Sequence, residues 1–122
     1  MTEITTATTR FDLEDRTYAF AKSVALFCKD LPRTISNIEY LKQVIRSSGS
    51  IGANYIEANE ALSRKDFLLR IKICRKEAKE TAYWLRLLVE TNEAAHRQFG
   101  LKLMNEAIEL KKILSAILVK SG

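Results

Sequence analysis

The sequence predicts an all-α protein, an antiparallel up-down four-helix bundle, from three observations. Its 122 residues include only four glycines and one proline, so few turns can form and long helices are favoured. Apolar residues recur at steps of three and four, the period of a helix, and no alternation typical of strands is present. The connections between these periodic stretches are short, which favours antiparallel neighbours.

Length and composition define the class of protein. A chain of this length normally forms one domain around one core, and 47% hydrophobic with 29% charged residues is typical of a soluble globular protein. Residues 1–10 hold five threonines and no apolar stretch, so we expect a disordered tail and no signal peptide. We expect residues 11–119 to form a single bundle domain in the cytoplasm, without a membrane partner, because no apolar run reaches the roughly 18 residues that span a bilayer.

The first two helices have readable ends. The first is expected from about Leu13 to Lys29, with Pro32 preventing its continuation. Its apolar stripe comprises Leu13, Thr17, Phe20, Val24, Phe27 and Leu31. The second helix is expected to open at Ser36, which forms a capping box with Glu39.

The last two helices follow the same logic. Ser63 and Asp66 form a weaker capping box for a third helix that ends near Glu90, and Asn92 is expected to cap the fourth. The apolar stripe of the fourth helix comprises Phe99, Leu103, Ala107, Leu110, Leu114 and Ile117. Gly100 lies in its first turns and should weaken them by about 1 kcal/mol relative to alanine.

The stretch RSSGSIGANYIEANEA, residues 46–61, places glycines and serines inside the second helix. The apolar register continues through it along Ile38, Leu41, Ile45, Ser48, Gly52, Tyr55, Asn59 and Leu62. A phosphate-binding loop would interrupt this register and would need a Gly-Lys-Ser/Thr ending after a strand. Ser48 and Gly52 therefore predict close packing of a neighbouring helix, with a ligand-contacting kink as the alternative. Asn59 needs hydrogen-bond partners if it is buried.

The net charge of the protein is concentrated in the third helix. Residues 64–86 hold eight cations and three anions, and the remaining twelve cations and twelve anions balance, so this segment carries the whole net charge of +5. The stripe of one face comprises Lys65, Lys72, Arg75, Lys76, Lys79, Tyr83 and Arg86. A one-sided basic stripe with an aromatic residue is the electrostatic pattern of a polyanion binder; a solvated charged face is the alternative.

A second set of apolar residues lies away from the expected core stripes of helices two and three. It comprises Tyr40, Val44, Ile51, Leu69, Ile73, Trp84 and Leu87. Large exposed apolar patches usually mark interfaces, so these residues predict contacts between subunits, with Trp84 as a natural anchor. The alternative is that they belong to a broad core.

The pattern gives little support for catalysis. His96 is the only histidine, so a Ser-His-Asp relay is not expected. The Glu57–Glu60 and Glu77–Glu80 pairs lack the histidine of di-metal bundles. Cys28 and Cys74 lack metal-ligand spacing and are expected to be buried, reduced thiols. We therefore expect no enzyme activity, no metal and no cofactor.

Three stretches resemble a known family: FDLEDRTYAFAKSV, IRSSGSIGANYIEANEALSRKDFLLRIKICRKEAKETAYWLRLL and LMNEAIELKKILSAIL. They resemble the bacterial four-helix-bundle proteins encoded in intervening sequences of large-subunit ribosomal RNA genes, over about residues 11–118. The same fold class includes the accessory variability protein of diversity-generating retroelements, a homopentameric barrel that binds nucleic acid and a reverse transcriptase. The resemblance implies a ring-forming bundle with a basic surface, and it does not imply an enzyme.

These lines combine into one functional expectation. We expect a homo-oligomer, a pentamer by the resemblance, that binds RNA or DNA by charge and shape. The alternative is a protein-interaction scaffold that docks an acidic partner or a reverse transcriptase, with nucleic-acid binding incidental.

Overall fold

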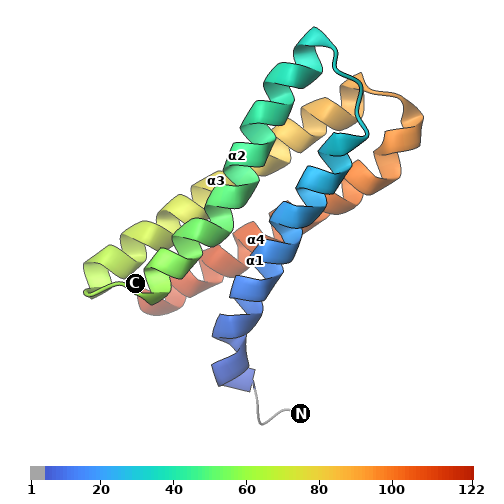
Figure 1. Cartoon of the computed structure of the whole chain (residues 1–122). Helices are drawn as coiled ribbons and strands as arrows, with labels where there is room; N and C mark the ends of the chain where they lie inside the picture. Colours follow the sequence, from blue (N-terminus) through green and yellow to red (C-terminus); the bar gives the residue numbers. More distant parts are fainter. Residues whose placement is uncertain (1–4) are drawn as a thin grey trace.

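The computed structural model describes the backbone of residues 5–122 and the side chains of residues 13–122. Four long helices make up almost all of this part of the chain: α1 (Thr5–Lys29), α2 (Ile35–Asn59), α3 (Arg64–Thr91) and α4 (Arg97–Ser121), with a short 3-10 turn, η2 (Ala94–His96), before α4 (Figure 1). No strand occurs between residues 5 and 122. The predicted all-α class with four helices is therefore confirmed.

Helix α1 begins earlier than the sequence predicts. It starts at Thr5, ahead of the expected start at Leu13, and ends at Lys29 as expected. Residues 5–10, predicted to belong to a disordered tail, are thus helical. The first part of that predicted tail, residues 1–4, lies outside the described residues.

The start of α2 corrects the predicted capping box. Thr34 is the capping residue, because its side-chain oxygen accepts a hydrogen bond from the Asn37 backbone N–H at 3.2 Å. Thr34 has extended backbone angles after the proline turn, the conformation that lets a hydroxyl reach the first free N–H groups. Ser36 and Glu39 then fall inside the helix. At the start of α3 the predicted cap is confirmed, since Ser63 accepts from the Asp66 N–H at 3.1 Å.

The prediction for Asn92 was wrong, because this residue ends α3 instead of capping α4. Its side-chain amide donates to the Leu88 carbonyl at 2.8 Å and to the Asn37 side chain at 2.9 Å. Asn37 is 1% exposed and also donates to the Pro32 carbonyl. The two asparagines thus join the first turn of α2 to the end of α3.

Further contacts show how the helices lie. Thr81 of α3 donates to Ser47 of α2 at 2.8 Å, and Arg70 donates to Asn54 at 2.9 Å, so α2 and α3 lie side by side along their length (Figure 1). In the N-terminal half of α1, Glu14 accepts a hydrogen bond from Asn59 at the end of α2, at 2.7 Å. A two-pronged ion pair between Arg16 and Glu106, at 2.6 and 2.9 Å, connects α1 to α4.

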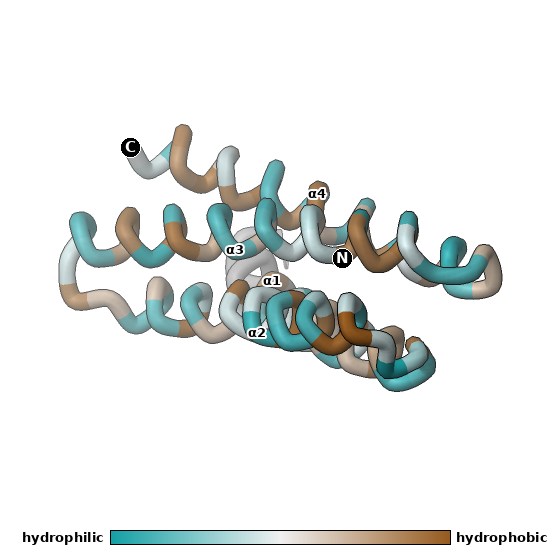
Figure 2. The backbone as a smooth tube through the Cα atoms, turned by 90° about the horizontal axis from the view of Figure 1, so that it is seen from above, coloured by the Kyte–Doolittle hydropathy of each residue, from teal (hydrophilic) through white to brown (hydrophobic). Residues whose placement is uncertain are grey.

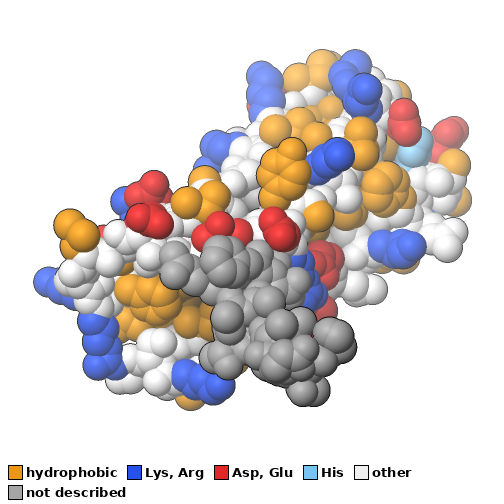
Figure 3. Space-filling view, turned by 60° about the horizontal axis from the view of Figure 1, so that its bottom comes forward, with side chains coloured by type: hydrophobic (Ala, Val, Ile, Leu, Met, Phe, Trp, Pro, Cys, Tyr) orange, Lys and Arg blue, Asp and Glu red, His pale blue; other side chains and the backbone are white. Residues whose placement is uncertain are grey.

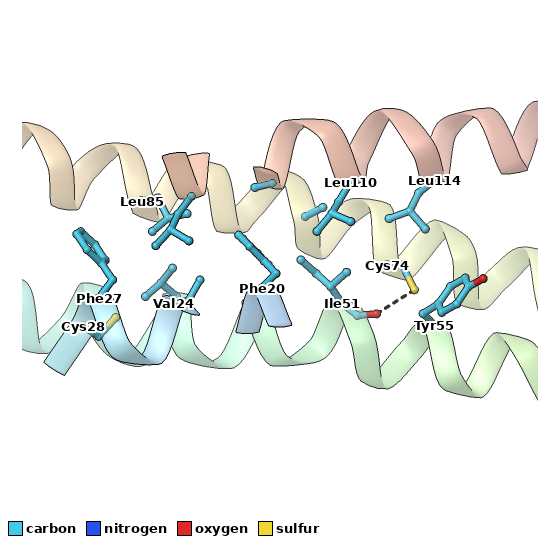
Figure 4. Packing of buried hydrophobic residues seen from close by; sticks show 14 of the residues in the cluster. Phe20, Val24, Phe27, Cys28, Ile51, Tyr55, Cys74, Leu85, Leu110 and Leu114 are labelled. Carbon is cyan, nitrogen blue, oxygen red and sulfur yellow. Dashed lines mark hydrogen bonds between the residues drawn. The ribbon is translucent and has the colours of Figure 1, made fainter. Parts of the chain in front are cut away.

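The core follows the predicted stripe of α1 and, from Leu103 to Leu114, that of α4, where Phe99 is 41% exposed, but it does not follow the stripe of α2 (Figure 4). Every residue of the predicted α1 stripe is at most 3% exposed. In α2, however, Ile38 and Ile45 are 37% and 49% exposed, whereas Val44 and Ile51 are fully buried. Because α2 packs against both α1 and α3, its buried face is centred between the two apolar stripes. Along each helix, hydrophobic residues alternate with polar ones, as expected when one face is buried and the other is in water (Figure 2).

Two glycines lie where helices approach closely. A Cβ at Gly52 would lie 2.9 Å from Thr17 Oγ1 of α1, and Ser48 one turn earlier is 2% exposed. A Cβ at Gly100 would lie 2.4 Å from Val89 Cγ2 and 3.1 Å from the Phe27 ring. Gly100 therefore has a packing role besides its local cost to α4. No helix within the described part of the chain is both long and apolar enough to cross a membrane.

Candidate nucleic-acid interface

A basic groove lies between α3 and α4. Lys72, Lys76 and Lys79 follow helical steps of four and three, so they lie on one face of α3. The groove has a volume of about 390 Å³ and is lined by Lys72, Arg75, Lys76, Lys79, Lys111 and Ser115. We call it the α3–α4 groove. It brings together five cationic side chains from two helices.

No carboxylate lines this groove. Among residues 13–122, none of its five cations forms an ion pair at 4.0 Å or less. The nearby acids of α3, Glu77 and Glu80, instead lie 3.9 and 3.8 Å from the Arg46 guanidinium on α2. The acids therefore lie on the α2 side of α3, and the α3–α4 groove keeps its positive charge.

Lys111 is the member of this site that lies outside the stripe predicted from the sequence. It lies half-buried on α4 and lines the groove, whereas its neighbour Lys112 pairs with Glu109 at 3.7 Å on the exposed surface. In the sequence, Lys111 is recognisable only as the neighbour of the core residue Leu110. The packing of α4 on α3 is what places Lys111 in one groove with the α3 lysines.

The structure separates both ends of the predicted stripe from its centre. Lys65 lines an adjoining, more apolar pocket with Leu69 and Lys72. Arg86 pairs with Glu90 at 3.1 Å, so its charge is neutralised locally. Of the six predicted cations, the four central ones share the α3–α4 groove.

Tyr83 follows Lys79 on the same face of α3 and is 58% exposed. Its ring meets the Trp84 ring edge to face, with centroids 5.1 Å apart and planes at 78°. Trp84 also packs against Tyr40 of α2 at 6.1 Å, and its buried Nε1 has no hydrogen-bond partner among the described residues. The three aromatic residues form a continuous cluster over α2 and α3.

Most of the predicted interface residues are buried or half-buried by packing within one chain. Val44 and Ile51 are fully buried in the core, so neither can contact a second chain and the prediction was wrong for both. The half-buried members are Tyr40, Ile73, Trp84 and Leu87. Only Leu69 is exposed, at 55%.

Surplus apolar surface lies instead over α1 and α2. A groove of about 530 Å³ has Ala25, Cys28, Ile38, Leu41 and Ile45 among its lining, and its cationic lining residues are Lys29, Arg33, Lys42 and Arg46. We call it the α1–α2 groove. Farther along the same helices, Tyr18 and Ile56 line a second hollow and are 71% and 47% exposed. On the face in Figure 3, acidic side chains lie near the middle and again at the end that carries the histidine, with basic side chains and hydrophobic patches among them.

The two thiols are buried, as predicted. Burial raises the pKa of Cys28 to about 11 and that of Cys74 to about 12, so both are protonated near neutral pH. Cys74 donates to the Ile51 carbonyl at 3.4 Å. Within the side chains that the structure describes, no group of three His, Cys, Asp or Glu residues could hold a metal ion.

Comparison with known proteins identifies the family. Residues 10–116 match the model of the 23S rRNA-intervening sequence protein family, so the chain belongs to this family and the resemblance noted from the sequence is confirmed. The chain is similar to a crystal structure of a protein with unknown function from the S23 ribosomal protein family of Bacteroides thetaiotaomicron. The two share 37% identity and a TM-score of 0.79, over 89% of this chain and 96% of that one. No curated protein matches the chain.

Proposed function

We propose that this protein is a non-catalytic bundle that binds nucleic acid through the α3–α4 groove. The observation that carries the proposal is the set of five cations, free of carboxylate partners among the described side chains, in one groove. Lysine and arginine at the surface bind phosphates and release condensed counterions, which supplies sequence-independent affinity for RNA or DNA. Four of the five are lysines, which act as point charges, so charge and shape dominate over base recognition.

The number of cations sets the expected salt dependence. If all five contact phosphates of a single strand, log affinity falls against log salt with a slope of about −3.5. Raising salt from about 50 to 200 mM then weakens binding about 100-fold. A flat salt dependence would exclude phosphate contacts as the source of affinity.

Charge reversal tests the groove itself. Lys72, Lys76 and Lys79 are changed together to Glu, and binding of a fluorescein-labelled 20-nucleotide RNA of mixed sequence is followed by anisotropy. We expect binding to be lost while the circular dichroism spectrum stays helical. The matched control changes Lys22, Lys42 and Lys102, exposed lysines on the other three helices, which lowers the net charge equally. Equal loss in both variants would show that overall charge, and not the groove, binds the RNA.

The α1–α2 groove favours a second candidate function, that of a scaffold for an acidic protein partner. Its apolar floor and its cationic lining suit an acidic amphipathic segment, and the family resemblance raises a reverse transcriptase as one such partner. A pull-down with and without nuclease separates the two functions. A partner that stays bound after nuclease treatment supports the scaffold, and one that is released supports the nucleic-acid proposal.

We also propose that this up-down bundle assembles into a homo-oligomeric ring, a pentamer by the family resemblance. The support is the exposed apolar surface on α1 and α2, which includes Ile38, Ile45 and Ile56 and which a lone chain would leave in water. A ring would repeat the α3–α4 groove by symmetry. Weak phosphate contacts would then add through effective concentration.

A further inference from the structure

We infer that Tyr83 stacks on an unpaired base at the end of the α3–α4 groove, so that the protein prefers single-stranded nucleic acid to duplex. This inference rests on the proposed function and deepens it. It is carried by three features of the structure: the position of Tyr83 relative to the groove lysines, the support behind its ring, and the charges on either side of it.

The position suits a base whose own backbone lies in the groove. Tyr83 continues the helical steps of Lys72, Lys76 and Lys79 on one face of α3. Lys79 and Tyr83 are separated by about 6 Å along the helix axis, since each residue adds about 1.5 Å. A nucleotide near Lys79 can therefore place its base over the Tyr83 ring. The ring is accessible, with 58% of the residue exposed.

The ring is also supported from behind. Trp84 meets Tyr83 edge to face at 5.1 Å, and Trp84 itself packs against Tyr40 of the neighbouring helix. An aromatic side chain that is already held in place loses less conformational entropy when a ligand binds. Tyr83 differs in this from Tyr18, which is 71% exposed and packs against no other aromatic ring among the side chains of residues 13–122.

The charges around Tyr83 favour a base over a further phosphate. The unpaired cations of the groove end at Lys79, and beyond Tyr83 Arg86 is neutralised by Glu90 at 3.1 Å. A phosphate here would approach a carboxylate without gaining a free cation. A base carries no charge and offers a π-face that stacks on an aromatic ring whatever its sequence. In a duplex both faces of each internal base are already stacked, so Tyr83 can engage an unpaired base but not an internal base pair.

The test compares one 20-nucleotide RNA with its blunt duplex, both fluorescein-labelled, against wild type, Tyr83→Ala and Tyr83→Phe. We expect Tyr83→Ala to weaken binding of the single strand about 10-fold and to leave duplex affinity unchanged. Tyr83→Phe, which keeps the ring, should bind the single strand like wild type. Equal effects on strand and duplex, or no effect on either, would overturn the inference.

Trp84 provides a second readout, because it is the only tryptophan of the chain and touches Tyr83. Its fluorescence should change saturably with unlabelled single strand in wild type and in Tyr83→Phe, and not with duplex. The same signal with duplex would contradict stacking. The variant with Lys72, Lys76 and Lys79 changed to Glu distinguishes failure of the groove proposal from failure of the stacking inference. If it loses both ligands while Tyr83→Ala affects neither, the groove proposal stands and the stacking inference fails; if wild type binds neither ligand, both fail.

Discussion

The α3–α4 groove and the α1–α2 groove each form between two neighbouring helices and both contain cations, yet only the α1–α2 groove has an apolar floor. The first holds five cations, and no carboxylate of residues 13–122 pairs with any of them. The second has an apolar floor, and two of its cations are already paired, Lys42 with Glu39 and Arg46 with Glu77 and Glu80. One small bundle thus presents free charge on one side and free apolar surface on the other.

The difference arises from how the acids and cations of α3 are distributed around the helix. Glu77 and Glu80 lie on the side that meets α2, where both pair with Arg46, whereas Lys76 and Lys79 lie on the side that meets α4. On α2 the buried face is centred between two apolar stripes, so Ile38 and Ile45 remain outside the core. Helical register relative to two neighbours, and not overall composition, decides which groove is charged.

The largest expected effect comes from breaking the α1–α2 side with Ile45→Glu. If this face is the contact between chains, the change brings a carboxylate into the apolar floor of the groove, and removing it from water there costs several kcal/mol. The mass by light scattering should then fall to that of one chain, 13.9 kDa. Because Ile45 is 49% exposed in the single chain, the thermal stability of the monomer should change little.

Leu69→Glu is the matched control for this prediction. Leu69 is 55% exposed on α3, and it is the one exposed member of the interface set predicted from the sequence. We expect the Leu69→Glu variant to remain oligomeric. A loss of mass in Leu69→Glu but not in Ile45→Glu would move the contact to α3, and a wild-type monomer at micromolar concentration would remove the ring from the proposal.

The same two sides explain what the sequence could and could not predict. The stripe of α1 was predictable in full because its six residues follow one unbroken series of three- and four-residue steps. The second helix has two apolar stripes, and periodicity alone gives no reason to choose between Ile45 and Val44. The lysines of α3 were visible as one face, but Lys111 joins them only through tertiary packing. The pairing of Asn37 with Asn92, across 55 residues, has no local signal either.

The junction between the two sides should be sensitive to Gly100→Ala. The added methyl group would meet Val89 of α3 at 2.4 Å and Phe27 of α1 at 3.1 Å, and overpacking of this kind costs about 2 kcal/mol. Gly49→Ala is the matched control, because nothing lies within 4 Å of its added Cβ. It should raise stability by about 0.5–1 kcal/mol, since alanine favours a helix over glycine. Urea unfolding measures both, and equal shifts in the two variants would contradict the packing role of Gly100.

A smaller effect is expected from Asn37→Ala at the start of α2. The change removes hydrogen bonds to the Pro32 carbonyl and to Asn92, at 2.9 and 2.7 Å, and should lower the free energy of unfolding by about 1–2 kcal/mol. Asn92→Ala and the double variant complete a cycle whose coupling energy should be about 1 kcal/mol. Asn105→Ala, an exposed residue of α4, should change stability by less than about 0.5 kcal/mol. Simple additivity of the Asn37 and Asn92 variants would show that the pair does not act as a unit.

A pH-dependent effect concerns the two thiols, Cys28 beside the α1–α2 groove and Cys74 in the core. Burial raises the pKa of Cys28 to about 11 and that of Cys74 to about 12, from an ordinary value of 9.0. The stability that these raised pKa values contribute is fully present below pH 9. It is lost as the pH rises toward 11 and 12, because the unfolded chain releases thiol protons that the folded chain retains. Urea unfolding at pH 7 and pH 10 should therefore show a smaller alkaline loss in the Cys28→Ala/Cys74→Ala double variant than in wild type, which shares its other titrating groups. An equal loss in both proteins, or alkylation of native Cys74 at pH 8 as fast as in denaturant, would contradict the buried and protonated state of these thiols.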